Sequence, residues 1–443
     1  MTFPITLETP IRFPGPLPDA TDVVIIGGGV IGVMTALYLA EAGERVVLLE
    51  KGRIAAEQSS RNWGWVRQQG RDPAELPIMM ESMRLWQGLS QRFGEALGFR
   101  QTGVMYLAET DRDLEGHEHW LGIAQAHGLD TRLMARCEIE ATLGTSAKWK
   151  GALFTPSDAR AEPWVAVPLL AGTAAEAGAI LVENCAARQL EISAGQVTGV
   201  VTEAGTIRAA RVVVAAGAWS RLFLAAHGVA LPQLAVLASV AASVPMPEIY
   251  PGAAADGQFA FRRRADGGYS LAPGAEHDFF IGPDAFRSFG AYLTVLKKDF
   301  RSTHFRAAAP KGYPDAWGTP RRWSGESPFE RCRILNPAPN MATLGRVQDS
   351  FARAFPALGR PKLQSVWAGM IDTMPDVVPV VDHAPLAGLT IATGMSGHGF
   401  GIGPGMGRVL ADLVRGRATG HDLGRFRLSR FHDGSPIELG PSL

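Results

Sequence analysis

The sequence has few cysteines and no excess of charge of either sign. Its three cysteines, Cys137, Cys185 and Cys332, are far apart and form no CxxC pair. This spacing is typical of a reducing compartment and argues against a disulfide framework or a cysteine zinc site. Because 43 basic residues balance 43 acidic ones, no overall field attracts nucleic acid. We therefore expect a cytoplasmic protein without a nucleic-acid partner.

Long apolar runs are also absent. No stretch reaches the length of a transmembrane span, and residues 1–20 lack the basic start and apolar core of a signal peptide. The chain has 443 residues, of which 46% are hydrophobic and 19% charged, so it is long enough for two or three buried cores. These features predict a soluble globular protein.

Histidines gather at one place, in a stretch with helical spacing at residues 117–127. His117, His119 and His127 are potential metal ligands, but no acidic or cysteine ligand completes a site there. We predict that the three histidines lie on a solvent-exposed helix face and that the chain binds no metal.

Residues 23–50 have the pattern of a strand, a glycine turn, a helix and a second strand. The first apolar run ends at Gly27-x-Gly29-x-x-Gly32, and Glu50 follows the second run. Gly27 permits a tight turn, Gly29 lets a pyrophosphate approach the backbone, and Gly32 lets the helix pack on the sheet. A carboxylate at the position of Glu50 can accept hydrogen bonds from a ribose diol.

The helix after the glycine turn begins at Val30 and Ile31. Its free N–H groups would face the phosphates of a bound nucleotide. Taken alone, this motif indicates a dinucleotide and leaves NAD and FAD equally open.

Further α/β elements alternate with antiparallel ones. The periodicity predicts a helix at 76–93, and a strand at 211–215 leads into a second glycine turn. A β-meander at 187–209 and a hairpin at 259–272 interrupt this order. We therefore predict an α/β fold in which a Rossmann-type layer is interleaved with an antiparallel β-sheet.

The second half of the chain contains three more predicted helices. One spans residues 347–355, and another spans 406–415 after the strand 389–393 and the glycine-rich turn 394–405. The third, at 287–300, is amphipathic and ends in a basic pair. We expect it to be a surface or lid helix, with contact to a membrane as the alternative.

Four motifs resemble, in order, those of the glycine oxidase and D-amino-acid oxidase superfamily of FAD enzymes. They are the GxGxxG turn with Glu50-Lys51, the loop 59–64, the turn 215–220 and Ser396-Gly397-His398-Gly399-Phe400. Within this superfamily the chain most resembles the bacterial L-amino-acid deaminases. They share a stretch like residues 54–59, a Phe-Arg strand like Phe261-Arg262 and an insertion before 328–330.

The resemblance implies two domains that are each discontinuous in sequence. A Rossmann-type FAD-binding domain would comprise residues 21–98, 160–232 and 372–425. A substrate-binding domain with an antiparallel sheet would comprise 99–159 and 233–371, and residues 1–20 would form an N-terminal extension.

The resemblance also implies which residues bind FAD. Ala187 would contact adenine, residues 216–217 would pass near the pyrophosphate or ribityl chain, and 396–405 would present N–H groups to the flavin. The expected FAD-binding residues are Gly27, Gly29, Val30, Ile31, Gly32, Glu50, Lys51, Gln58, Ser59, Ser60, Arg61, Asn62, Trp63, Gly64, Ala187, Ala216, Gly217, Trp219, Gly369, Gly397, His398, Gly399, Phe400 and Gly401. No cysteine occurs at 367–373 and no histidine at 58–64, so we expect non-covalent FAD.

An amino-acid substrate needs a carboxylate clamp. Arg262 matches the anchoring arginine of the deaminases, and Arg67 matches a carboxylate-binding arginine of the sarcosine oxidases. Either guanidinium offers a bidentate fork. A surface salt bridge is the alternative for each.

Five other side chains are candidates for the substrate site. Trp367, with Trp63 or Trp65, could form its apolar walls, although buried tryptophans are core residues at least as often. Asp372 could meet a substrate ammonium or cap a turn. His398 is expected to contact the flavin or brace the backbone.

These features predict an FAD enzyme that oxidises the C–N bond of an amino acid to an imine, which hydrolyses to a 2-oxo acid. The alternatives are a dehydrogenase or oxidase of secondary amines such as N-alkyl amino acids, imino acids or opines, and a subunit that does not turn over alone. Gly401 stands where sarcosine oxidases carry a lysine, which weakens the sarcosine alternative. The electron acceptor, whether oxygen, a quinone or a redox protein, stays open.

Overall fold

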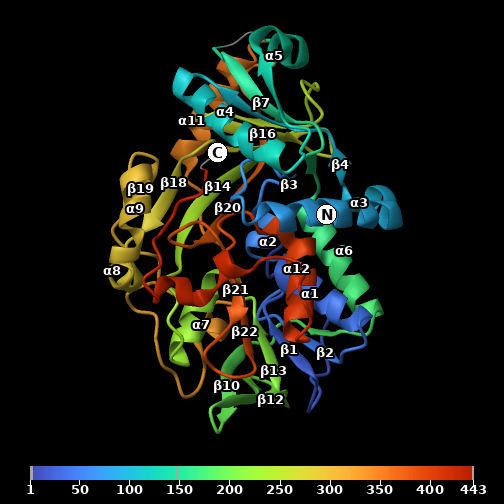
Figure 1. Cartoon of the computed structure of the whole chain (residues 1–443), viewed down its shortest axis with the longest axis vertical. Helices are drawn as coiled ribbons and strands as arrows, with labels where there is room; N and C mark the ends of the chain where they lie inside the picture. Colours follow the sequence, from blue (N-terminus) through green and yellow to red (C-terminus); the bar gives the residue numbers. More distant parts are fainter. Residues whose placement is uncertain (1–2, 146–147, 442–443) are drawn as a thin grey trace.

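The computed structural model describes residues 3–145 and 148–441. An α/β layer forms the lower half of the molecule in Figure 1, and a large antiparallel sheet forms the upper half. The predicted fold class, a Rossmann-type layer interleaved with an antiparallel sheet, is confirmed.

The α/β layer is built on a six-stranded sheet in the order β21-β22-β13-β1-β2-β9. Its strands are β1 (Val23–Ile26), β2 (Val46–Leu49), β9 (Ile180–Val182), β13 (Arg211–Val214), β21 (Val380–His383) and β22 (Leu389–Thr393). All pairs are parallel except β21 with β22. Every residue of β1 and β2 is buried, as expected for strands that helices or loops cover on both faces.

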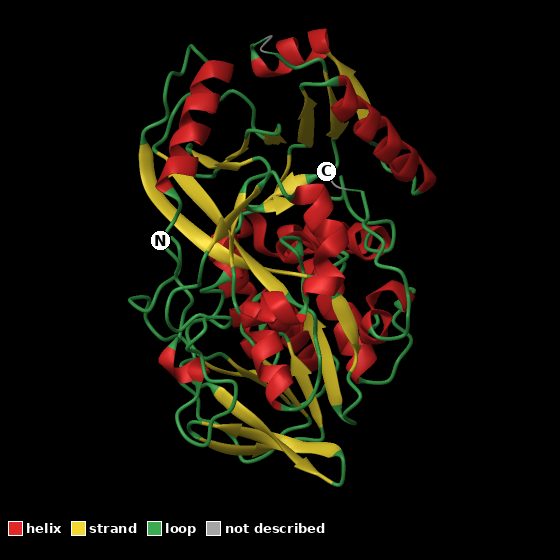
Figure 2. Ribbon diagram, turned by 90° about the vertical axis from the view of Figure 1, so that its left-hand side faces the viewer, coloured by secondary structure: helices red, strands yellow, loops and turns green. Residues whose placement is uncertain are grey.

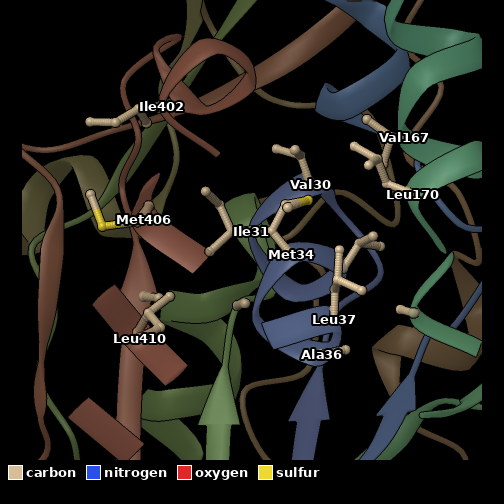
Figure 3. Packing of buried hydrophobic residues seen from close by; sticks show 14 of the residues in the cluster. Val30, Ile31, Met34, Ala36, Leu37, Val167, Leu170, Ile402, Met406 and Leu410 are labelled. Carbon is tan, nitrogen blue, oxygen red and sulfur yellow. The ribbon is translucent and has the colours of Figure 1, made fainter. Parts of the chain in front are cut away.

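Four helices pack together beside this sheet. They are α1 (Val30–Glu41), α3 (Leu76–Phe93), α6 (Pro163–Glu176) and α12 (Gly399–Val414). Two of them, α1 and α6, contact its strands directly. Figure 3 shows α1 between Val167 and Leu170 of α6 on one side and Met406 and Leu410 of α12 on the other. A Cβ atom on Gly407 would lie 2.4 Å from the Cβ of Met34, so only glycine permits this approach.

The second sheet has ten strands and is antiparallel for the most part. Its strands are β5 (Val104–Ala108), β6 (Arg132–Ala135), β7 (Gly151–Thr155), β14 (Leu234–Ser243), β15 (Ala253–Ala255), β16 (Phe259–Arg263), β17 (Tyr269–Pro273), β18 (His277–Phe280), β19 (Thr303–Arg306) and β20 (Leu363–Thr373). The long pair β14 and β20 runs from Leu234 opposite Thr373 to Ser243 opposite Leu363. The helix α11 (Met341–Ala354) packs against β16 and β17, and its Phe351 is fully buried there.

Smaller elements complete the chain, as Figure 2 shows from the side. The predicted meander is a separate three-stranded sheet, and another small sheet joins distant segments. These strands and the remaining helices are β10 (Ala187–Ser193), β11 (Gln196–Thr202), β12 (Gly205–Arg208), β3 (Trp65–Val66), β4 (Arg100–Gln101), β8 (Ala159–Arg160), α2 (Gln58–Arg61), α4 (Asp111–Ala126), α5 (Arg136–Leu143), α7 (Ser220–Ala226), α8 (Pro283–Arg287), α9 (Phe289–Asp299), α10 (Pro328–Arg331), and the 3₁₀ helices Gly94–Leu97, Gly217–Trp219, Gly424–Phe426 and Leu428–Phe431. Within 3–145 and 148–441, no helix is long and apolar enough to cross a membrane.

Three predicted helices differ in their bounds. The helix predicted at 406–415 begins at Gly399, because close packing against α1 outweighs the low helix propensity of its glycines. The helix predicted at 347–355 begins at Met341, where the Asn340 side chain accepts a hydrogen bond from the Thr343 N–H group. The helix predicted at 287–300 is α9, which begins at Phe289, while Arg287 ends the preceding short helix α8.

The prediction for the histidines of α4 is wrong for His117. Its side chain is buried, whereas His119 is exposed, and burial lowers the His117 pKa to about 4. Helix α4 therefore turns its first histidine towards the sheet. The described residues contain no group of three or more histidine, cysteine, aspartate or glutamate side chains placed to hold a metal ion.

His117 should make the protein sensitive to acid. Its folded pKa lies below the ordinary 6.5, so the unfolded chain binds more protons as the pH falls from about 6.5 to about 4. We expect this group to lower the free energy of unfolding by about 2–3 kcal/mol across that window. Denaturant unfolding of wild type and His117→Leu at pH 7 and pH 4.5 tests this. If the free energy of unfolding falls by the same amount between pH 7 and pH 4.5 in both proteins, His117 is not the cause of the acid sensitivity.

Candidate cofactor and substrate site

A cavity of about 400 Å³ lies between the two large sheets. Its walls come from the glycine turn after β1, the end of β2, residues 55–71, the turns after β13 and β22, strands β14 and β20, and the start of α12. Segments far apart in sequence therefore form one site.

The glycine turn forms one end of this cavity. Gly27 has φ +117°, and a Cβ atom there would lie 2.3 Å from the carbonyl oxygen of Ala215. The Val30 N–H group donates to Ser59 Oγ at 2.9 Å, which holds the loop against the helix start. Gly29 and Ile31 line the cavity with Val30. Bare backbone and a helix N-terminus thus face the cavity, as a pyrophosphate requires.

Glu50 lies beside this turn. Its two carboxylate oxygens accept hydrogen bonds from the N–H groups of Gly28 (2.8 Å) and Gly52 (2.7 Å). Burial raises the Glu50 pKa to about 7 even though Lys51 and these N–H groups favour the charged form. Each oxygen keeps a second lone pair, so the site fits a ribose diol as hydrogen-bond donor.

Aromatic side chains line the same end of the cavity. Three aromatic residues lie here: Trp219, Phe223 and Phe329. Ala187 of β10 lies beside them, and Ala216 and Gly217 form the adjoining turn. Lys51 also lines this end. However, its ammonium donates to Glu57 Oε1 at 2.6 Å and to the carbonyls of Cys332 and Arg333, so protein acceptors already bind all three of its N–H groups.

The loop after β2 contributes Gln58, Ser59, Arg61, Asn62 and Trp63 to the lining. One guanidinium nitrogen of Arg61, Nη2, is buried without a hydrogen-bond partner, which fits an acceptor that the cofactor would supply.

Four expected FAD-binding residues do not line the cavity. Ser60 and Gly64 face the protein interior, where a Cβ atom on Gly64 would meet the Ala161 carbonyl. Gly32 packs the helix on the turn, because a Cβ atom there would lie 2.0 Å from Gly27 O. Gly401 lies in the first turn of α12, and its carbonyl accepts hydrogen bonds from Ser82 and Trp86 of α3.

The start of α12 forms the opposite end of the cavity. Gly397, His398, Gly399 and Phe400 line it, and Gly369 of β20 lies close by. The unpaired N–H groups and positive dipole end of a 16-residue helix favour negative charge at this position. This arrangement suits the pyrimidine end of a flavin, which becomes more negative on reduction.

His398 lies beside a buried carboxylate. Its Nδ1 lies 3.3 Å from Glu75 Oε2. Burial and the charge of Arg71 lower the His398 pKa to about 4, so the imidazole is neutral at physiological pH. The ring that lines the cavity is thus uncharged and lies beside a buried carboxylate, to which its Nδ1 forms no well-aligned hydrogen bond.

Two predictions are wrong: Arg262 was expected to bind the substrate carboxylate and Trp367 to form a wall of the substrate site, but neither side chain lines the cavity. Arg262 has no exposed surface, and its guanidinium forms a two-pronged ion pair with Glu162 at 2.8 and 3.1 Å. Trp367 donates to the Arg61 carbonyl at 2.9 Å and packs against other aromatic rings. Both side chains are parts of the interior.

Arg71 is the residue that the sequence analysis missed. It is 2% exposed and lines the cavity beside Arg67, and its Nη1 is buried without a hydrogen-bond partner. Burial and the charge of Arg67 lower its pKa to about 10, so it stays charged at neutral pH. The available signal was the Arg-x-x-x-Arg spacing in a polar loop after the cofactor motif.

Arg67 lies over the ring of Tyr106, 5.4 Å from its centroid, and donates to the Gln69 carbonyl. In the described part of the chain, no carboxylate lies within ion-pair distance of Arg67 or Arg71. Buried arginines elsewhere, such as Arg262 and Arg430, have such a partner. The cavity thus holds two guanidinium groups that can bind an anion.

The other predicted substrate residues divide into two groups. Trp63 and Trp65 line the cavity in an edge-to-face pair with ring centroids 5.3 Å apart, next to Val240 of β14. Asp372 also lines it, but its Oδ2 accepts from the Gly394 N–H group at 2.7 Å and from Gln233 at 3.0 Å. Asp372 thus braces the turn that leads to α12.

Comparison with solved structures gives extensive matches. The L-amino acid deaminase from Proteus myxofaciens, solved in complex with anthranilate, matches with a TM-score of 0.89 and 31% identity, covering 95% of each chain. L-proline dehydrogenase from P. horikoshii matches with a TM-score of 0.77 and 25% identity, covering 96% of this chain and 100% of that one.

Curated sequences give weaker matches of similar extent. Sarcosine oxidase subunit beta of Rhizobium meliloti (strain 1021) is 27% identical over 436 residues, which are 96% of this chain and 92% of that protein. The mitochondrial dimethylglycine dehydrogenase of Mus musculus is 26% identical over 403 residues, or 89% of this chain. The chain spans only 42% of the length of that dehydrogenase.

A family model matches residues 22–413, which include both ends of the cavity and both large sheets. It describes the DAO family of FAD dependent oxidoreductases. The predicted superfamily and the predicted cofactor are therefore confirmed: the chain belongs to the DAO family of FAD-dependent oxidoreductases.

Proposed function

We propose that this chain oxidises the Cα–N bond of an amino acid to an imine, which water then hydrolyses to a 2-oxo acid. The observation that carries this proposal is the pair Arg67 and Arg71, two guanidinium groups without an ion pair in the cavity that holds the cofactor motifs. Such a pair is suited to the carboxylate that amino acids share. The similarity to an L-amino acid deaminase over 95% of both chains supports the same class of substrate.

Bound FAD would accept the hydride from Cα, with its two electrons, while the amine lone pair forms the C=N bond. The protein's own part is to hold the substrate. A carboxylate bound by Arg67 and Arg71 would fix one end of the molecule, and Trp63 and Trp65 would cover its side chain and exclude water.

The amine must be neutral for its lone pair to take part. His398 is the histidine that lines the cavity, and it is itself neutral at physiological pH. A neutral imidazole can accept a hydrogen bond from the substrate without adding a repelling positive charge.

Oxidation of a secondary amine is the second candidate function. It is favoured by the similarity to sarcosine oxidase subunit beta, because sarcosine is a secondary amine, whereas the dimethylglycine named for the second relative is a tertiary amine. The first of these is one subunit of an oxidase by name, so membership of a complex belongs to this candidate.

Product analysis separates the candidates. The holoprotein is incubated with an artificial electron acceptor and either L- and D-amino acids or their N-methyl derivatives. A 2-oxo acid and ammonia from primary amino acids support the proposal. Products from N-methyl derivatives alone support the second candidate, and no product from any amine contradicts both.

A further inference from the structure

Residues 327–336, which we call the closing segment, lie against the α/β layer. They come from the C-terminal part of the region predicted to form the substrate-binding domain. Lys51 Nζ donates to the carbonyls of Cys332 at 2.8 Å and Arg333 at 3.0 Å, and the Leu335 N–H group donates to Glu57 Oε1 at 2.9 Å. The closing segment is therefore fastened to the residues that follow β2.

Glycine at position 52 permits this contact. A Cβ atom on Gly52 would lie 2.3 Å from the carbonyl oxygen of Arg333, so the two backbones touch. Arg61, from the loop that lines the cavity, donates to Asn336 Oδ1 at 2.7 Å. The C-terminal half of the closing segment is thus fixed beside the cavity.

Phe329 is the residue of the closing segment that reaches the cavity. Its side chain is buried and lines the end formed by Ala187 and Glu50. It packs against Trp219 and Phe223 at centroid distances of 5.7 and 5.8 Å. A flat aromatic wall of this kind suits the adenine of FAD.

An ion pair holds α10, which carries Phe329, against the meander. Arg188 donates to both carboxylate oxygens of Glu330, with Nη2 at 2.6 Å and Nε at 3.0 Å. Arg188 directly follows Ala187, so the pair lies next to the expected adenine contact. The Glu330 side chain is 7% exposed and that of Arg188 is 32% exposed, so the carboxylate is shielded while the guanidinium is partly open to solvent.

We propose that the closing segment is a cap over the ADP end of the FAD site, with Phe329 as the covering side chain and the Arg188–Glu330 pair as its fastening. FAD would then leave only when the cap opens. The dissociation rate of FAD should therefore depend on residues that belong to neither the glycine turn nor the flavin end of the cavity.

The test is the rate at which FAD dissociates from the holoprotein after dilution, followed by the rise of flavin fluorescence. We expect Phe329→Ala to release FAD at least tenfold faster than wild type, because the variant loses the aromatic wall. Arg331→Ala is the matched control on the same helix, since Arg331 pairs with Glu326 on the exposed surface. Its rate should stay within twofold of wild type.

Arg188→Gln provides a second variant that leaves the cavity lining unchanged, and it should release FAD severalfold faster. If the circular dichroism spectrum of Phe329→Ala differs from that of wild type, Phe329→Ala is misfolded. The FAD dissociation rate of Arg188→Gln then tests the proposal by itself. Rates equal to that of Arg331→Ala in both folded variants would overturn the proposal. FAD that remains attached after denaturation would also overturn it, because a covalent bond would then retain the cofactor.

Discussion

Replacing Arg71 with leucine is expected to lower kcat/KM for an amino-acid substrate by roughly 10³-fold, if two charge-assisted hydrogen bonds of about 2 kcal/mol each are lost. The cause is the loss of a guanidinium group that is buried in the cavity and has an unpartnered nitrogen. Steady-state kinetics with an artificial electron acceptor measure the change.

A decarboxylated amine of the same side chain is the matched substrate. It cannot use the clamp, so Arg71→Leu should change its kcat/KM only a few-fold. An equal loss for both substrates would remove Arg71 from the carboxylate clamp. Replacing Arg262 would have a different effect from replacing Arg71. It would break the buried pair with Glu162, leave an uncompensated charge and destabilise the fold.

Replacing Gly27 with alanine is expected to weaken FAD binding by more than roughly 100-fold, because both backbone strain and a clash oppose the native turn. The residue has φ +117°, and its new Cβ atom would lie 2.3 Å from the Ala215 carbonyl. The turn after β1 must therefore move away from the turn after β13. Titration of the apoprotein with FAD measures the dissociation constant.

Gly43→Ala is the control in the same strand-helix-strand unit. Gly43 also has a positive φ, +83°, but no atom lies within 4 Å of the added Cβ. We expect it to lower the free energy of unfolding by about 1 kcal/mol through backbone strain and to leave FAD affinity unchanged. Similar losses of FAD affinity in both variants would show that strain alone, and not the contact with Ala215, explains the effect.

Local patterns in the sequence predicted most of the elements. The helix α3 and the strand β22 have the predicted bounds, because an amphipathic period and a short apolar run each identify one element without information from the rest of the chain. The start of α12 could not be predicted in this way. Its glycines signal a turn, and only contact with α1 makes them helical.

The substrate site was harder to predict than the cofactor site. The cofactor motifs are contiguous, whereas the role of Arg262 depends on Glu162, one hundred residues away. The strand register turns Arg262 towards that carboxylate, and no local pattern reveals the pairing. Arg71 has no such partner, and that absence is visible only once the described chain is folded.

The division into two domains remains a prediction. The six-stranded sheet falls within the residues predicted for the FAD-binding domain, and the ten-stranded sheet falls almost wholly within the other set. The closing segment belongs to the second set in sequence but is fastened to the first in space. Domain boundaries that are predicted from sequence motifs cannot show that a segment of one domain packs against the other.

The most direct test of the proposed function is anaerobic bleaching of the protein-bound FAD. The holoprotein is mixed with L- and D-amino acids, their N-methyl derivatives and the corresponding decarboxylated amines, and the flavin absorbance is followed. We predict that at least one primary amino acid bleaches the flavin and that its decarboxylated amine does so at least 100-fold more slowly. Bleaching by amines irrespective of a carboxylate, or by no amino acid at all, would contradict the proposed function.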